Sequence, residues 1–300
     1  MVLIEEYPHL HPATQPLAGE SNEQRIRRIR TDRWIAYARA EQALLCLEDL
    51  LSFPNRTRMP NLLLIGPTNN GKTMILEKFR RTHPPLEASD APDKVAHVPV
   101  LKIQMPPGPD ERRFFGAILE TLGLPIAPYE QVASLQGAAI KLMRDTQVRL
   151  LAIDEVHNLL SGSRLQQRRM LNLLRWLGNE LQIPLVAVGT ADALRAVQSD
   201  DQLANRFEPL ALPPWREGSE YRRLLMTLEA VLPLRRPSGL ADSALAAKIL
   251  SASEGILGEI MAIVIRAAVQ AISCGAEAIS AKIIDATHFI APSERRRVAV

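Results

Sequence analysis

The stretch that decides the fold of this chain reads Gly66-Pro67-Thr68-Asn69-Asn70-Gly71-Lys72-Thr73. It lies between an apolar run, Leu62 to Ile65, and a segment of helical character, Met74 to Arg80. Two glycines let the backbone curl so that successive N–H groups point inward, and the start of a helix adds the positive end of its dipole. Lys72 places a positive charge where β- and γ-phosphates would lie, and the Thr73 hydroxyl is a ligand for Mg²⁺. This pattern predicts a loop that binds phosphates with Mg²⁺, as a kinase, a GTPase or an ATPase would need, and the alternative is a glycine-rich turn with an incidental lysine.

The predicted nucleotide contacts cover this loop and the first residue after it. They are Gly66, Pro67, Thr68, Asn69, Asn70, Gly71, Lys72, Thr73 and Met74.

Two adjacent acids, Asp154 and Glu155, end the apolar run Leu150 to Ile153. Open α/β sheets bind ligands at the carboxyl ends of their strands, so we expect both acids beside the phosphate loop. Asp154 would hold Mg²⁺ together with Thr73, and Glu155 would orient and polarise the attacking water. The two motifs together predict ATP hydrolysis, whereas acids on an ordinary surface loop are the alternative.

Two further residues are candidates for catalysis because each stands at the end of a predicted element. Thr190 follows an apolar strand, and its hydroxyl could contact the attacking water or the γ-phosphate, or could cap the helix that begins at Ala191. Arg206 precedes the last predicted strand, Leu210 to Leu212, and could reach the nucleotide of an adjacent protomer as a finger or form a plain salt bridge. The predicted catalytic residues are Glu155, Lys72, Thr190 and Arg206.

The alternation of short apolar runs with helical segments predicts an α/β fold with a parallel sheet covered on both faces. From residue 217 to residue 289 only helical periodicity is present, which predicts a second, all-helical domain. The expected division is an N-terminal arm with a basic segment over 1–30, an α/β core over 31–214, a helical lid over 215–292 and a basic tail over 293–300.

Composition excludes several classes of protein. Apolar residues make up 47% of the chain and charged residues 23%, as in globular proteins, and the net charge of +3 says little about partners. The first residues include acids where a signal peptide needs basic residues, and the most apolar segment, 256–272, is interrupted by Glu259 and Arg266. The two cysteines, Cys46 and Cys274, suit buried, reduced thiols. We therefore expect a cytoplasmic protein without a membrane partner.

The order of these motifs, followed by helices, resembles the AAA+ ATPases. Three longer stretches resemble the TniB/TnsC transposition ATPases, and TniB most closely: Thr31 to Tyr37 (TDRWIAY), the phosphate loop, and Ile153 to Asn158 (IDEVHN). The resemblance implies an AAA+ P-loop NTPase with a parallel five-stranded sheet flanked by helices and a C-terminal helical lid. It also implies that a helix from Thr31 to Leu51 flanks the adenine.

The resemblance implies a function as well. Proteins of this kind are transposition regulators that bind ATP, assemble on double-stranded DNA as rings or helical filaments, and recruit or activate a DDE transposase. ATP hydrolysis, slow and regulated by DNA, would then reset the assembly. Many AAA+ lids carry an arginine that touches the γ-phosphate, but Gly255 to Ile260 contains none, which suits a slow switch better than a fast motor.

Basic side chains near the expected inner surface of such an assembly are candidates for phosphate contacts with DNA, independent of base sequence. One cluster follows the second strand and the other follows the acidic pair; their members are Lys102, Arg112 and Arg113, and Arg164, Arg168 and Arg169. The segment Arg25 to Arg30 forms a third basic face, for nucleic acid or a neighbouring subunit. For each cluster a solvated surface is the alternative. The six histidines, His157 among them, show no spacing typical of metal ligands, so structural roles are expected for them.

A helicase-loader-like or signalling AAA+ ATPase that acts on a protein partner is the alternative function, because these proteins share the same core residues. A gene for a DDE transposase beside this one would favour the first interpretation. A small-molecule P-loop kinase fits less well, because Glu155 and Arg206 suit water and a neighbouring subunit.

Overall fold

The computed structural model describes residues 7–86 and 96–298, which divide into two compact units. One unit consists of Arg39–Pro213, and the other joins Met1–Ala38 to Pro214–Val300. Residues 87–95, residues 1–6 of the expected N-terminal arm and residues 299–300 of the expected tail lie outside the described residues. Within the described part of the chain, none of the helices has the length and apolar composition needed to span a membrane.

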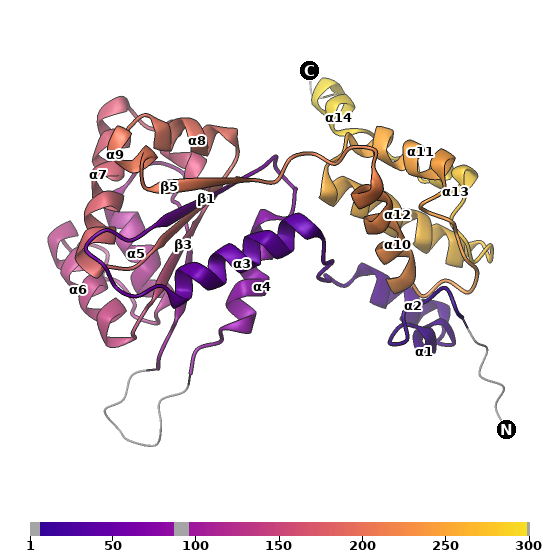
Figure 1. Cartoon of the computed structure of the whole chain (residues 1–300), viewed down its shortest axis with the longest axis horizontal. Coiled ribbons are helices and arrows are strands. Elements are labelled where there is room, and N and C mark those ends of the chain that lie inside the picture. Colours follow the sequence, from indigo (N-terminus) through magenta and orange to yellow (C-terminus); the bar gives the residue numbers. More distant parts are fainter. Residues whose placement is uncertain (1–6, 87–95, 299–300) are drawn as a thin grey trace. The chain divides into compact units, whose positions relative to one another are not determined.

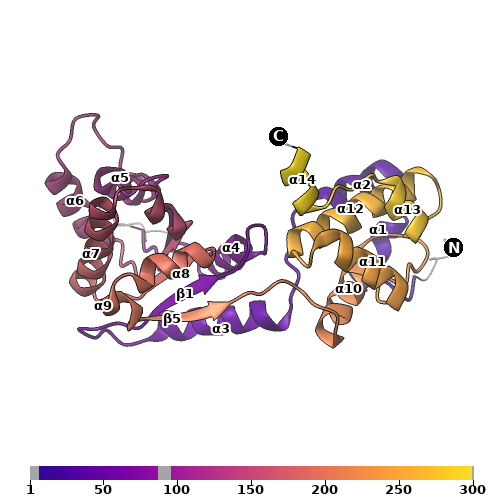
Figure 2. The ribbon, with the colours of Figure 1, turned by 90° about the horizontal axis from the view of Figure 1, so that it is seen from above.

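The first unit is built on a five-stranded parallel sheet with the order β2-β3-β4-β1-β5 and helices on both faces (Figures 1 and 2). This architecture confirms the expected α/β fold class. The strands are β1 (Asn61–Ile65), β2 (Val100–Gln104), β3 (Leu150–Asp154), β4 (Leu185–Gly189) and β5 (Phe207–Ala211).

The inner strands form because their apolar runs are buried on both faces of the sheet, as the sequence predicts; every residue of β3 and β4 is buried. The edge strand β5 is longer than predicted. It contains Glu208 and Pro209, both exposed, which interrupt the apolar pattern but are tolerated where one side of a strand faces solvent.

Side-chain caps fix where two helices of this unit begin. Asp110 caps α5 by accepting a hydrogen bond from the Arg113 N–H, and Ser163 with Gln166 forms a capping box at the start of α7. The helices are α3 (Ala38–Ser52), α4 (Lys72–Thr82), α5 (Glu111–Thr121), α6 (Val132–Asp145), the 3-10 helix η1 (Val156–Ser161), α7 (Arg164–Leu181), α8 (Ala191–Gln198) and α9 (Asp201–Ala204).

The helix expected from Thr31 to Leu51 begins only at Ala38, and residues 32–37 have no regular secondary structure. Ile35 and Tyr37 instead pack with the helices of the second unit, and Tyr37 meets Trp215 edge to face. Ile35 is buried and Tyr37 is half-buried in these contacts.

The second unit is all helical and includes the N-terminal segment, in place of the separate arm that the sequence suggests. Helix α2 lies against α12 (Figures 1 and 2), and Ile29 of α2 is fully buried in the shared core. The helices are α1 (Gln15–Ala18), α2 (Asn22–Arg30), α10 (Ser219–Val231), α11 (Ser243–Ser253), α12 (Leu257–Ser273), α13 (Ala281–Ala286) and α14 (Pro292–Val298).

Much of the basic tail expected over 293–300 is helical, and one of its arginines is paired. Arg295 of α14 forms an ion pair with Glu259, a buried residue near the start of α12, and its guanidinium lies over the ring of Phe289. The segment Gly255 to Ile260, which contains no arginine, thus carries the buried Glu259 carboxylate, and Arg295 of the tail forms an ion pair with it.

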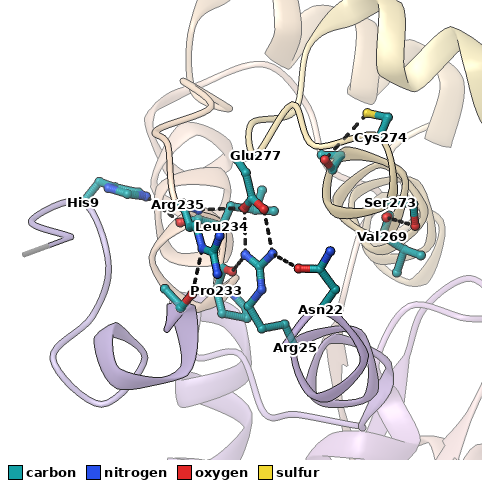
Figure 3. A network of polar contacts seen from close by, with 12 residues as sticks. His9, Asn22, Arg25, Pro233, Leu234, Arg235, Val269, Ser273, Cys274 and Glu277 are labelled. Atoms are coloured by element: carbon teal, nitrogen blue, oxygen red, sulfur yellow. Dashed lines mark hydrogen bonds and ion pairs between the residues drawn. The ribbon is translucent and has the colours of Figure 1, made fainter. Parts of the chain in front are cut away.

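The buried side chain of Arg25 attaches α2 to the rest of this unit (Figure 3). Its Nη1 donates to Glu277 Oε2 at 2.7 Å and to Pro233 O at 3.1 Å, and its Nη2 donates to Glu277 Oε1 at 2.7 Å. Burial raises the pKa of Glu277, but hydrogen bonds from Arg25 and from the Arg235 N–H outweigh it and hold this pKa below its usual value. Arg25 therefore does not belong to the basic face expected over 25–30.

Replacing Arg25 with methionine is expected to destabilise the helical unit by about 3 kcal/mol, because it leaves the Glu277 carboxylate without its buried partner. Amide hydrogen exchange of α2 and α12 measures the change. The matched control is Arg27→Met on the same helix, an exposed position where an effect below about 0.5 kcal/mol is expected. Equal exchange in the two variants would contradict the role given to Arg25.

Candidate nucleotide-binding site

The predicted phosphate loop connects β1 to α4, and both of its glycines are required by geometry. Gly71 has a φ of 85°, in the left-handed region, immediately before α4 begins. A Cβ on Gly66 would lie 2.7 Å from Leu212 O, which is closer than atoms can pack. The buried Asn70 side chain donates to the same carbonyl at 2.8 Å, so the loop is anchored to the chain that follows β5.

The Lys72 side chain is buried inside this loop. Its Nζ donates to Gly66 O at 2.8 Å and to Pro67 O at 2.6 Å. Burial lowers the pKa of Lys72, and the carboxylates of Glu155 and Asp154 oppose that shift. The loop thus holds an ammonium group at its centre, as an anion site requires.

Thr73 and Asp154 converge at the edge of the loop. The Thr73 Oγ1 donates to Asp154 Oδ2 at 2.9 Å, and Asp154 Oδ1 accepts the Glu155 N–H at 2.9 Å. A hydroxyl and a buried carboxylate are oxygen ligands of the kind Mg²⁺ takes. These two residues therefore fit the metal site that the sequence predicts.

Glu155 follows β3 in a left-handed backbone conformation, with a φ of 57°. This conformation is uncommon outside glycine, and it places the side chain at the end of the strand. Its Oε2 lies 3.1 Å from Nε2 of His157, in η1. The carboxylate is thus held by a second side chain that the sequence analysis treats only as structural.

Thr190 lies next to the phosphate loop, because Gly66 N donates to Gly189 O at 3.2 Å and Thr190 is the next residue after Gly189. Thr190 occupies the N-cap position of α8, but its side chain makes no capping hydrogen bond. Of the two roles that the sequence leaves open, capping is not observed.

Arg206 lies at the opposite edge of the sheet from the phosphate loop. Asn61 N, at the start of β1, donates to Arg206 O at 3.0 Å, and the loop follows the other end of that strand. Five residues of strand separate the two edges by roughly 16 Å. Arg206 is therefore placed away from the phosphate loop of its own chain.

The Arg206 side chain is half-buried and donates from Nη1 to Asn179 Oδ1 at 2.7 Å. Burial and the charges of Arg58 and Arg175 lower its pKa, and Asp200 opposes them. Among the described residues no ion pair to Arg206 is present, so the plain salt bridge considered above is not formed.

The first expected DNA cluster is not assembled as a single surface. Lys102 lies inside β2 with its Nζ 4.0 Å from Asp154 Oδ2, so it belongs to the nucleotide site rather than to a loop. Arg112 donates to the carbonyls of Ala127 and Pro128, and Arg113 pairs with Asp110 at 3.7 Å. The strand register places Lys102 beside the acidic strand, which the linear order does not reveal.

The second expected cluster lies together on the surface. Arg164, Arg168 and Arg169 are exposed in the first turns of α7, and Arg164 and Arg168 are one turn apart on the same face. This end of a helix also carries the positive end of the dipole. The arrangement suits contact with an anionic partner.

Sequence reasoning did not assign His157 and Lys102 to the nucleotide site. The available signal for His157 was its position two residues after Glu155. For Lys102 the sequence contains no such signal, because the position of Lys102 beside Asp154 depends on the pairing of β2 with β3. Within the described part of the chain no group of three or more His, Cys, Asp and Glu side chains could hold a metal ion.

A family model described as bacterial TniB protein matches residues 25–217. No curated protein matches the chain.

Several solved structures share the fold. The Aeropyrum pernix ORC1 protein in complex with DNA is 18% identical, with a TM-score of 0.57 over 88% of this chain and 68% of that one. The ORC2 protein of the same organism, in ADPNP–ADP complexes, is 18% identical, with a TM-score of 0.59 over 87% and 70%. Cdc6p from Pyrobaculum aerophilum is 16% identical, with a TM-score of 0.57 over 87% and 70%. These likenesses show the AAA+ fold.

Proposed function

Because the chain belongs to the TniB family of AAA+ ATPases, we propose that it is an ATP-dependent regulator of transposition that assembles on double-stranded DNA and recruits or activates a DDE transposase. Family membership supports the role in transposition. ATP binding would favour assembly, and hydrolysis would reset it.

The observation that carries the proposed hydrolysis is the position of Asp154 between Thr73 and Glu155. Lys72 would contact the β- and γ-phosphates, and Glu155 would orient the attacking water. Mg²⁺, held by Thr73 and Asp154, would neutralise charge on the phosphates. Thr190, beside Gly66, has a hydroxyl that is not used for capping and would contact the water or the γ-phosphate.

Assembly is supported by the place of Arg206 at the far edge of the sheet. An arginine there can complete the nucleotide site of another copy, where its planar guanidinium would stabilise charge that develops on the γ-phosphate. Its hydrogen bond to Asn179 would hold the side chain in place before a second copy arrives. We propose that each site is shared between two copies of the chain.

The proposed DNA surface is the exposed α7 cluster of Arg164, Arg168 and Arg169. Arg112 and Arg113 are engaged by backbone carbonyls and by Asp110, whereas the described residues supply no ion pair to the three α7 side chains. Phosphate contacts of this kind do not read base sequence. They weaken as salt rises, because protein binding releases counterions from the DNA and this release is less favourable at higher salt concentration.

Replacing the three α7 arginines with alanine is expected to weaken DNA binding at low salt and to reduce the slope of log K against log salt by about 3. Titration of a labelled duplex at several salt concentrations, with ATP and Mg²⁺ present, measures both quantities. The matched control is the double variant Arg112→Ala and Arg113→Ala, which is expected to keep the wild-type slope. If the control lost the slope and the α7 variant kept it, the DNA surface would lie at α5.

A further inference from the structure

The acid pair is followed by a histidine that contacts the residue proposed to orient water. His157 Nε2 lies 3.1 Å from Glu155 Oε2. An ionised carboxylate only accepts hydrogen bonds, so Nε2 carries the proton and donates it to Glu155. In the neutral imidazole this assignment leaves Nδ1 of His157 as an acceptor.

The Nδ1 atom is buried, and within the described residues it has no hydrogen-bond partner. A buried acceptor without a partner costs free energy, so the arrangement is not explained by stability alone. The unpaired atom, Nδ1, lies at the buried edge of the ring, whereas Nε2 at the other edge bonds to Glu155.

The end of β4 fixes the position of the ring. A Cβ on Gly189 would lie 3.5 Å from His157 Nδ1 and 3.4 Å from His157 N, so the ring packs directly against the glycine backbone. The same Cβ would lie 2.6 Å from the Ala193 Cβ, which excludes a larger residue there. His157 is therefore held between β4 and Glu155, and its ring has a defined orientation.

The contact with His157 does not turn Glu155 away from the nucleotide site. Burial lowers the pKa of Lys72 and the charge of Glu155 opposes this shift, so the Glu155 carboxylate lies within electrostatic reach of the phosphate loop. The other polar residues of η1 are engaged elsewhere: Asn158 donates to Met105 O at 3.1 Å, and Ser161 donates to Pro107 O at 2.7 Å. His157 is thus the residue that orients Glu155.

We propose that His157 is a positioning residue for ATP hydrolysis: its Nε2–H holds Oε2 of Glu155, so that Oε1 is presented to the attacking water. The inference rests on the proposed ATPase function and adds a residue to it. It follows the general arrangement in which a catalytic base is oriented by a third group. Loss of such a supporting hydrogen bond typically lowers activity by about 10- to 100-fold.

Two substitutions separate positioning from packing. His157→Phe keeps a ring but removes the donor, and we expect it to lower kcat by about 10- to 100-fold with little change in KM for ATP. His157→Gln keeps an N–H donor, and we expect it to recover most of the lost kcat. Steady-state hydrolysis, binding of a fluorescent ATP analogue and thermal unfolding are measured for both variants and for the wild type.

A double variant tests whether His157 acts through Glu155. When His157→Phe is added to Glu155→Gln, we expect no further loss of the residual rate, because the group that His157 orients is already inactive. A further loss equal to that seen in the wild-type background would overturn the inference, as would a His157→Phe variant with wild-type or higher kcat. Equal losses in the Phe and Gln variants would also overturn it.

The proposed function is tested separately in the same experiment. If the wild-type chain hydrolysed no ATP with Mg²⁺ and DNA, the ATPase function itself would fail, and this inference with it. If the wild type hydrolysed ATP and His157→Phe matched it, only the role of His157 would fail.

Discussion

Arg206→Ala is expected to lower ATP hydrolysis by about 10³-fold while leaving nucleotide binding by the single chain unchanged. An arginine that stabilises transition-state charge contributes about this much to kcat. Because Arg206 lies at the edge of the sheet opposite the phosphate loop, its loss leaves the loop of its own chain intact. Measuring hydrolysis beside the affinity for a fluorescent ATP analogue separates the two effects.

A mixing experiment shows whether Arg206 acts on a neighbouring copy. Lys72→Ala retains Arg206 but loses the loop lysine, and Arg206→Ala has the opposite defect. Random mixing of equal amounts restores roughly a quarter of the interfaces to the native pair, so we expect hydrolysis well above that of either variant alone. A mixture no more active than the sum of its components would show that Arg206 does not complete a neighbour's site.

Glu155→Gln is expected to lower hydrolysis by about 10³-fold and to prolong the DNA-bound assembly. The amide keeps the shape of the side chain but loses the charge that orients and polarises water. Nucleotide binding should persist, since the loop and its contacts with Lys72 and Thr73 do not involve the Glu155 carboxylate. Dissociation from labelled DNA after dilution, with ATP present, gives the lifetime.

The result that would contradict this role for Glu155 is a variant that no longer binds ATP. The same would hold if it bound ATP and dissociated from DNA as fast as the wild type. Asp110→Asn is a suitable control, because Asp110 is an acid that caps α5 and is not expected to affect water activation.

The α/β core and the nucleotide motifs could be predicted because they depend on local order. A glycine-rich loop after an apolar run, and two acids after another, stand at the ends of strands wherever the strands lie in the sheet. The strand order then brings them together, with β1 and β3 on either side of β4. The position of Thr190 beside Gly66 follows from the same order.

The remaining features depend on contacts between distant segments. Arg25 looks like part of a basic face, but its partner Glu277 lies far along the chain, and only the packing of α2 on α12 brings them together. The pairing register of β2 and β3 places Lys102 beside Asp154 at the nucleotide site. The charge pattern around these residues is the same as that of solvated surface, so no local rule distinguishes them.

The helical unit shows why its boundary was also difficult to predict. Ile29 and Ile35 of the N-terminal segment are buried in the core of this unit. In the sequence they are only isolated apolar residues in a short basic stretch. Their burial contributes about 1.5 to 3 kcal/mol each, enough to hold the segment against the C-terminal helices. An apolar face of this kind does not reveal which part of the chain covers it.

We expect ATP to join copies of this chain on DNA through shared nucleotide sites. Electron microscopy of the purified protein with double-stranded DNA, in the presence and absence of a non-hydrolysable ATP analogue, tests it most directly. We expect rings or helical filaments with regularly spaced subunits on the DNA only when the analogue is present. Isolated monomers that leave the DNA bare in both conditions would contradict it.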